Sequence, residues 1–165
     1  MELLDGKRIL QEVKDELKQE VSRITASGKR PPFLVAILAG NDGASETYVA
    51  SKEKNSHECG FTSHIVRFPA TVTESELLSE IARLNTDDTV DGFIVQMPLP
   101  AHINATRVID AIAPEKDVDG FTTINTGKLT KGFDCFVPAT PMGVMEMLRR
   151  YSIPTAGKHC VVIGR

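Results

Sequence analysis

The sequence is poor in the patterns that mark metal centres, disulfide frameworks and membrane segments. It has three cysteines, an odd number without a CxxC pair, and four histidines without ligand spacing. We therefore expect reduced thiols and no metal site. No apolar run approaches the length of a membrane span, and the first residues lack the basic and apolar regions of a signal peptide. These absences predict a cytoplasmic protein with no membrane partner.

The charge of the chain is nearly balanced. Nineteen Lys and Arg residues against 22 Asp and Glu residues give a formal net charge of −3, so no nucleic-acid partner is indicated. Of the 165 residues, 41% are hydrophobic and 25% are charged. This composition is typical of a globular protein with enough chain to bury a core.

Apolar runs alternate with amphipathic segments along the chain. The continuous apolar run at 33–39 predicts a strand that is buried on both faces. Further strands are predicted at 61–68, within 91–100 where prolines end the strand, and at 159–165. Helices are predicted at 6–26, 44–60, 73–84, 104–112 and 140–151, and residues 114–130 look loop-like. We expect Thr73 and Glu76 to form a capping box, and Pro141 to take the first position of the last helix. The alternation predicts an α/β fold of three layers around a mostly parallel sheet.

The helix predicted at 44–60 carries a pair of residues that could take part in chemistry. We expect Ser45 to cap its start and Gly60 to end it in the left-handed conformation. Tyr48 and Lys52 are four residues apart and therefore share one face. A ring beside an amine can hold a flat ligand and transfer protons, but the same spacing fits an amphipathic helix with a solvated lysine. Short-chain dehydrogenases also have Tyr-x-x-x-Lys, but no glycine-rich loop precedes Tyr48, and that family is set aside.

Three further positions carry polar groups that two interpretations fit. Gln96 ends an apolar strand, so its amide bonds either to loop backbone or to Lys52 or a ligand. Asp117 and Asp119 either form a turn beside a glycine or accept paired N–H bonds from a ring such as a pterin. Gly164 and Arg165 follow an apolar strand, a weak indication of a nucleotide-binding turn.

Taken together, five segments resemble the bifunctional methylenetetrahydrofolate dehydrogenase/methenyltetrahydrofolate cyclohydrolase family. They are SETYVASK at 45–52, VQMPLP at 95–100, PEKDVDGF at 114–121, PATPMGV at 138–144 and VVIGR at 161–165. Each segment is modest alone, but all five occur in the order and spacing of the family across nearly the whole chain. The resemblance therefore outweighs the interpretations that any single segment allows.

The resemblance implies a role for each matching residue. Lys52 matches the catalytic lysine, Tyr48 the aromatic that stacks on folate, and Gln96 the glutamine that bonds the lysine. Asp119 matches the carboxylate that binds the pterin. These four make up the implied catalytic set, and Val95 and Met97 add backbone groups to the same substrate site. Gly164 and Arg165 match the start of the NADP-binding turn.

The resemblance also implies an activity, a domain division and partners. The activity is NADP-dependent oxidation of methylenetetrahydrofolate to methenyltetrahydrofolate, followed by hydrolysis to formyltetrahydrofolate. Residues 1–140 would form a folate-binding catalytic domain, and 141–165 a linker helix and the first strand of an NADP-binding Rossmann domain. We expect no complete NADP site in these residues, a dehydrogenase step that needs a second domain, and a homodimer for full-length members. Two alternatives stay open: a folate-binding fragment without turnover, and half of an unrelated α/β dehydrogenase.

Overall fold

The computed structural model describes residues 3–163, and a parallel sheet of three strands lies at its centre. The middle strand is β1 (Phe33–Ala39), with β2 (Thr62–Phe68) on one side and β3 (Gly92–Val95) on the other. Because β1 has a neighbour at each edge and helices over each face, it can be apolar throughout. The α/β class and the parallel sheet are as predicted.

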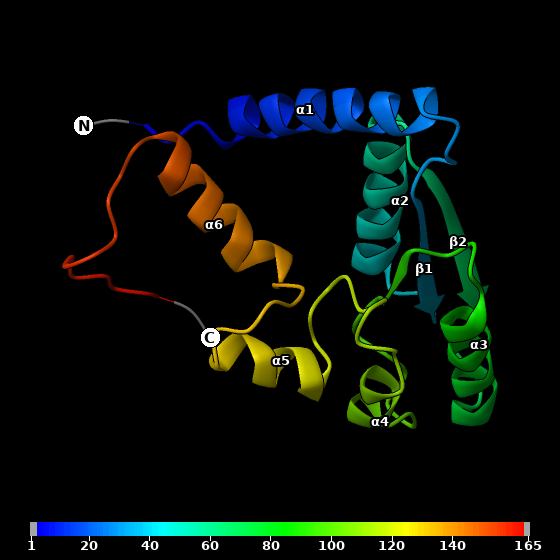
Figure 1. Ribbon diagram of the computed structural model, residues 1–165. Helices are drawn as coiled ribbons and strands as arrows, with labels where there is room; N and C mark the ends of the chain where they lie inside the picture. Colours follow the sequence, from blue (N-terminus) through cyan, green and yellow to red (C-terminus); the bar gives the residue numbers. More distant parts are fainter. Residues whose placement is uncertain (1–2, 164–165) are drawn as a thin grey trace.

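Helices cover both faces of the sheet and extend beyond it (Figure 1). They are α1 (Gly6–Ala26), α2 (Gly43–Glu58), α3 (Glu74–Thr86), α4 (Ala105–Asp110), α5 (Thr123–Thr130) and α6 (Ala139–Arg150). The larger apolar cluster joins the sheet to α3 and α4 and includes Ile37, Leu77, Phe93 and Val108. The smaller one lies on the opposite face, under α2, and its buried members are Ala36, Leu38, Val49 and Ile94. Alternate residues of β1 therefore serve opposite layers.

Two helix starts show how the sequence signals worked. The predicted capping box is present in α3: Thr73 Oγ1 accepts from Glu76 N at 3.2 Å, and Glu76 Oε2 accepts from Thr73 N at 2.8 Å. The predicted cap of α2 is wrong. Asp42 caps that helix, with its carboxylate accepting from Ser45 N at 2.8 Å. Aspartate and serine both suit the N-cap position. Asp42 takes it here, because Ser45 is buried, with only 3% of its surface exposed.

Three expectations about the second half of the chain also differ from the structure. The segment 114–130 is not all loop, because Thr122 caps the helix α5. Helix α5 contains β-branched residues and a glycine, which gives it a low helix propensity, so tertiary contacts must hold it. Pro141 occupies the third position of α6 and not the first.

The strand expected at 159–165 is absent from the described residues of that range. Residues 159–163 have no regular structure and are exposed. A strand needs a neighbour for its backbone groups, and none lies beside this segment in the described part of the chain.

Two buried side chains, Ile9 and Val21, and several ion pairs hold the long helix α1 against the rest of the molecule. Arg150 of α6 reaches Glu16 at 2.6 Å, and Lys14 reaches Glu58 of α2 at 2.6 Å. Tyr151, which follows α6, accepts from Asp5 N at 2.9 Å. None of the helices within residues 3–163 has the length and apolar character needed to span a membrane.

Candidate active site

A cavity of about 310 Å³ lies where α2 meets the carboxyl end of β3. In parallel α/β sheets, ligands bind at these strand ends. The residues that line the cavity are Tyr48, Lys52, Val95, Gln96, Met97, Asp119, Phe121, Ala139 and Thr140. The structure thus brings together all six residues that the sequence assigned to the substrate site, from three segments far apart in the chain.

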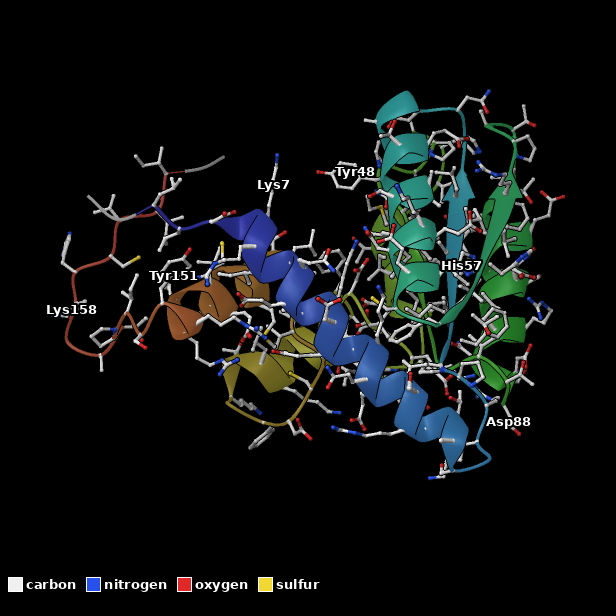
Figure 2. The ribbon with its side chains drawn as sticks, turned by 90° about the horizontal axis from the view of Figure 1, so that it is seen from above. Lys7, Tyr48, His57, Asp88, Tyr151 and Lys158 are labelled. Carbon is white, nitrogen blue, oxygen red and sulfur yellow. The ribbon has the colours of Figure 1, made fainter. Side chains whose placement is uncertain are left out.

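Helix α2 presents Tyr48 and Lys52 through the way it packs on the sheet. Ser45 and Val49, four residues apart, are its buried residues. Tyr48 therefore lies off the buried face, is 65% exposed, and projects away from the sheet (Figure 2). Lys52 is half-buried. An exposed ring next to a half-buried amine can cover a flat ligand while the amine reaches its edge.

The end of β3 supplies the polar backbone of the cavity. Gln96 N donates to Ile37 O at 2.9 Å, the last bond of the β1–β3 pair. The Gln96 side chain then turns to Met97 O, to which its Nε2 donates at 2.8 Å. Ser45 Oγ donates to the same oxygen at 3.3 Å. Among the described residues no hydrogen bond joins Gln96 to Lys52. The Gln96 amide bonds to loop backbone, which is the first of the two interpretations that the sequence allowed.

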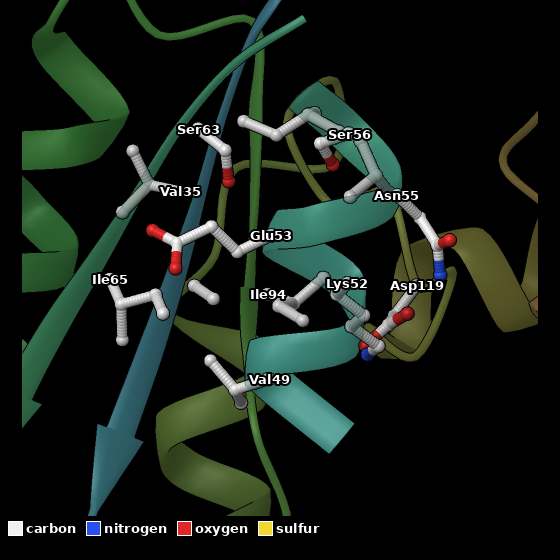
Figure 3. Close-up of a pocket in the computed structure, with 13 residues that line it drawn as sticks. Val35, Val49, Lys52, Glu53, Asn55, Ser56, Ser63, Ile65, Ile94 and Asp119 are labelled. Atoms are coloured by element: carbon white, nitrogen blue, oxygen red, sulfur yellow. The ribbon is translucent and has the colours of Figure 1, made fainter. Parts of the chain in front are cut away.

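Asp119 is the acidic group of the cavity, and its surroundings shift its acidity. Burial raises the pKa of the Asp119 carboxyl above its ordinary value, the positive charge of Lys52 opposes the rise, and the negative charge of Asp117 adds to it. Figure 3 shows Lys52 and Asp119 at the same end of a neighbouring pocket. The cavity therefore pairs an amine with a carboxyl that accepts a proton more readily than an ordinary aspartate does.

The pocket in Figure 3 is a second hollow of about 280 Å³, between α2 and the sheet. Its walls are largely apolar, from Val49, Ile65, Ile94 and Val118. It shares only Lys52 and Asp119 with the first cavity. These two residues thus stand at the boundary between the two hollows.

Some residues that line the cavity were missed from the sequence, and two residues assigned from the sequence lie outside the described part of the chain. Phe121, Ala139 and Thr140 line the cavity although only the family motifs around them pointed there. The sequence predicts a capping role for Ser45, whereas its side chain donates to Met97 O. Gly164 and Arg165, assigned to the NADP turn, lie outside the described residues.

The fold and the cavity define an α/β domain with a cavity at the strand ends. Residues 4–119 match the family model described as the tetrahydrofolate dehydrogenase/cyclohydrolase catalytic domain. The chain belongs to this family.

Similar proteins are named FolD. The bifunctional protein FolD of Porphyromonas gingivalis is 56% identical over 163 residues, which are 99% of this chain and 55% of that protein. The structure of the FolD enzyme from Campylobacter jejuni has a TM-score of 0.90 at 44% identity, covering 93% of this chain and 54% of that one.

A third relative was solved with ligands. The FolD structure from Trypanosoma brucei, complexed with NADP cofactor and an inhibitor, has a TM-score of 0.87 at 36% identity, covering 93% of this chain and 53% of that one. The chain thus spans about half the length of the relatives it matches.

Proposed function

We propose that this chain forms the folate-binding catalytic part of a methylenetetrahydrofolate dehydrogenase/methenyltetrahydrofolate cyclohydrolase. The observation that carries the proposal is the single cavity that gathers Tyr48, Lys52, Gln96 and Asp119. Membership of the family supports it. The alternative of an unrelated α/β dehydrogenase is set aside, because the family match covers most of the chain.

Each residue has a proposed part in binding or hydrolysis. The exposed ring of Tyr48 stacks on the pterin. The Asp119 carboxylate accepts two neighbouring N–H groups of that ring, which an acceptor with two oxygens can do. Lys52 manages the proton of the attacking water at the methenyl carbon, directly or through a second water. Gln96 holds Met97 O in place and with it the backbone edge of the site.

NADP is proposed as the redox partner of the whole enzyme, on the strength of the relative solved with it. It would accept the hydride of the dehydrogenase step. Residues 159–163, which lead to the Gly164 and Arg165 assigned to NADP, are exposed and have no regular structure. We further propose that 1–140 is the catalytic domain, that 141–165 begins the nucleotide-binding domain, and that the full-length enzyme is a cytoplasmic homodimer.

Hydrolysis without nucleotide tests the proposal. The chain should hydrolyse methenyltetrahydrofolate faster than the spontaneous rate. The reaction is measured as the loss of the absorbance of methenyltetrahydrofolate. Lys52→Met should remove this activity but leave tetrahydrofolate binding within a few-fold, because a lysine that moves a proton contributes mainly to the reaction step. Lys54→Met is the matched control, since Lys54 lies on the same helix with its side chain 77% exposed.

The outcomes separate the remaining alternatives. Binding without hydrolysis by the wild-type chain would identify a folate-binding module without turnover. Hydrolysis that survives Lys52→Met would refute the role of Lys52. Failure to bind tetrahydrofolate at all would refute the proposed function.

A further inference from the structure

A buried carboxylate lies next to the cavity without lining it. Asp117 is 1% exposed. Its two oxygens accept from Thr122 N at 2.9 Å, Asn125 Nδ2 at 2.9 Å and Phe121 N at 3.2 Å. Burying a carboxylate costs free energy unless hydrogen-bond donors surround it. The three donors offset this cost, and the same bonds fix the position of the segment that provides them.

The segment held in this way is the one that carries Asp119. Gly120 N donates to the backbone oxygen of Asp117 at 3.0 Å, which closes a turn with Asp119 inside it. The carboxylate of Asp117 then binds the two backbone N–H groups that follow the turn, those of Phe121 and Thr122. Asp119 and Phe121 both line the cavity. Asp117 therefore binds the backbone of the segment whose side chains, those of Asp119 and Phe121, line the cavity.

The base of the turn is fixed to the sheet. Phe93 N of β3 donates to Lys116 O at 2.9 Å. Lys116 Nζ donates in turn to Leu84 O at 2.8 Å and Asp87 O at 2.7 Å, at the end of α3. Asn125 Nδ2, which also binds Asp117, donates to Pro114 O at 2.8 Å. The stem of the turn is thus bonded both to β3 and to the end of α3.

The outer side of the turn is closed by the chain that leads into α6. Gly120 has a φ of +66°, and a Cβ placed there would lie 2.5 Å from Phe136 O and 3.2 Å from Pro138 Cδ. Only glycine permits this approach. The turn is held between the Asp117 carboxylate within and residues 136–138 outside.

We propose that Asp117 is a positioning residue of the folate site, which holds Asp119 in register with Lys52 through its bonds to Phe121, Thr122 and Asn125. The inference rests on the proposed function, because the affinity for folate is what the position of Asp119 determines. Asp117 itself does not touch the ligand.

The position requires a carboxylate and not an amide of the same size. An asparagine has one acceptor oxygen, and its Nδ2 would face either Phe121 N or both Thr122 N and Asn125 Nδ2. The charge of Asp117 also supports the raised pKa of the Asp119 carboxyl, of which burial is the main cause. Asp117→Asn thus removes acceptors and charge while it conserves shape.

A double-mutant cycle tests the inference, with tetrahydrofolate affinity measured by titration calorimetry. Asp117→Asn and Asp119→Ala should each weaken binding by roughly ten- to hundredfold, the range expected when hydrogen bonds to a charged group are lost. If Asp117 acts through Asp119, the double variant should bind within about threefold of Asp119→Ala. Multiplied effects in the double variant would overturn the inference, because a general loss of structure does not depend on Asp119.

Asp110→Asn is the matched control. The carboxylate of Asp110 accepts from Thr123 N at 2.8 Å and Thr123 Oγ1 at 2.9 Å, at the start of the same helix α5. Its loss should lower the melting temperature without changing affinity. If Asp110→Asn weakens binding as much as Asp117→Asn, then any disturbance of α5 has that effect and the inference fails.

A milder variant covers the case in which Asp117→Asn does not fold. Asn125→Ala removes one of the three donors and should weaken binding by a few-fold, with the same dependence on Asp119. Suppose that Asp119→Ala weakens binding but a folded Asp117→Asn variant keeps the wild-type affinity. That result would refute the inference and leave the proposed function intact. If Asp117→Asn fails to fold, unchanged affinity in Asn125→Ala has the same meaning. Absence of tetrahydrofolate binding in the wild-type chain would instead refute the proposed function, and the inference with it.

Discussion

Helix α2, which presents Tyr48 and Lys52, should open more easily than the rest of the fold, and Val49 is the position at which to test this. Val49 is 0% exposed and packs in the smaller apolar cluster with Ala36, Leu38 and Ile94. Other ties of α2 include the Ser45 contact with Met97 O, an ion pair between the exposed side chains of Glu46 and Arg67, and an ion pair between Glu58 and the less exposed Lys14. Exposed ion pairs contribute at most about 1 kcal/mol each, so the small cluster must carry much of the attachment.

Val49→Ala deletes the equivalent of two methylene groups, each worth about 0.8 kcal/mol when buried. With a modest cavity term, the loss amounts to about 2 kcal/mol. A loss of this size corresponds to a change of about 30-fold in an equilibrium constant. We therefore expect the α2 amides to exchange with solvent about 30-fold faster in native-state hydrogen exchange, with the amides of α3 much less affected.

Val108→Ala is the matched control, because Val108 is also 0% exposed but lies in the larger cluster. It should lower the global free energy of unfolding by a similar amount without accelerating exchange in α2 selectively. If the amides of α2 and α3 respond equally to Val49→Ala, then α2 opens only with the whole molecule. That result would refute the prediction that α2 opens independently of the rest of the fold.

Two further predictions concern charged groups. Asp119→Asn should increase stability at neutral pH: burial raises the pKa of the wild-type carboxyl above 3.8, so the wild type loses stability as pH rises through that raised value. Urea unfolding should show the advantage of the variant disappearing below pH 3.8, and a pH-independent advantage would contradict the reasoning. Arg150→Ala should destabilise the contact of α6 with α1, where Arg150 reaches Glu16 at 2.6 Å, by an amount that shrinks at high salt in thermal unfolding. Hydrogen bonds from Arg149 and then Arg150 lower the pKa of Glu146 to about 2. The ionised Glu146 therefore stabilises the fold above its ordinary pKa of 4.5, and this stabilisation is lost as pH falls towards 2 in the wild type and at higher pH in Arg150→Ala. Equal salt and acid responses of the wild type and the variant would argue against this role of Arg150.

The sequence determined the elements whose signals are local. The apolar run of β1 and the capping box of α3 needed no tertiary information, because burial on both faces and reciprocal capping each leave a pattern in the chain. The motifs around Lys52, Gln96 and Asp119 were enough to identify the family. Alternation of strands and helices was enough for the α/β class.

Tertiary structure decided the matters in which two local solutions were equally good. Asp42 and Ser45 are both good helix caps, and the choice fell to Asp42 because Ser45 is buried against Met97 O. The amide of Gln96 had two available partners, and the backbone oxygen of Met97 lay within reach.

Helix α5 shows most clearly what the sequence alone could not determine. Its own residues favour helix weakly, and it forms where Thr122 and Asn125 meet the buried carboxylate of Asp117. Those bonds also set the position of Asp119 in the cavity. The sequence by itself indicated six of the residues that line the cavity. The tertiary structure decided how they are held, because a buried carboxylate finds its donors only when the chain has folded around it.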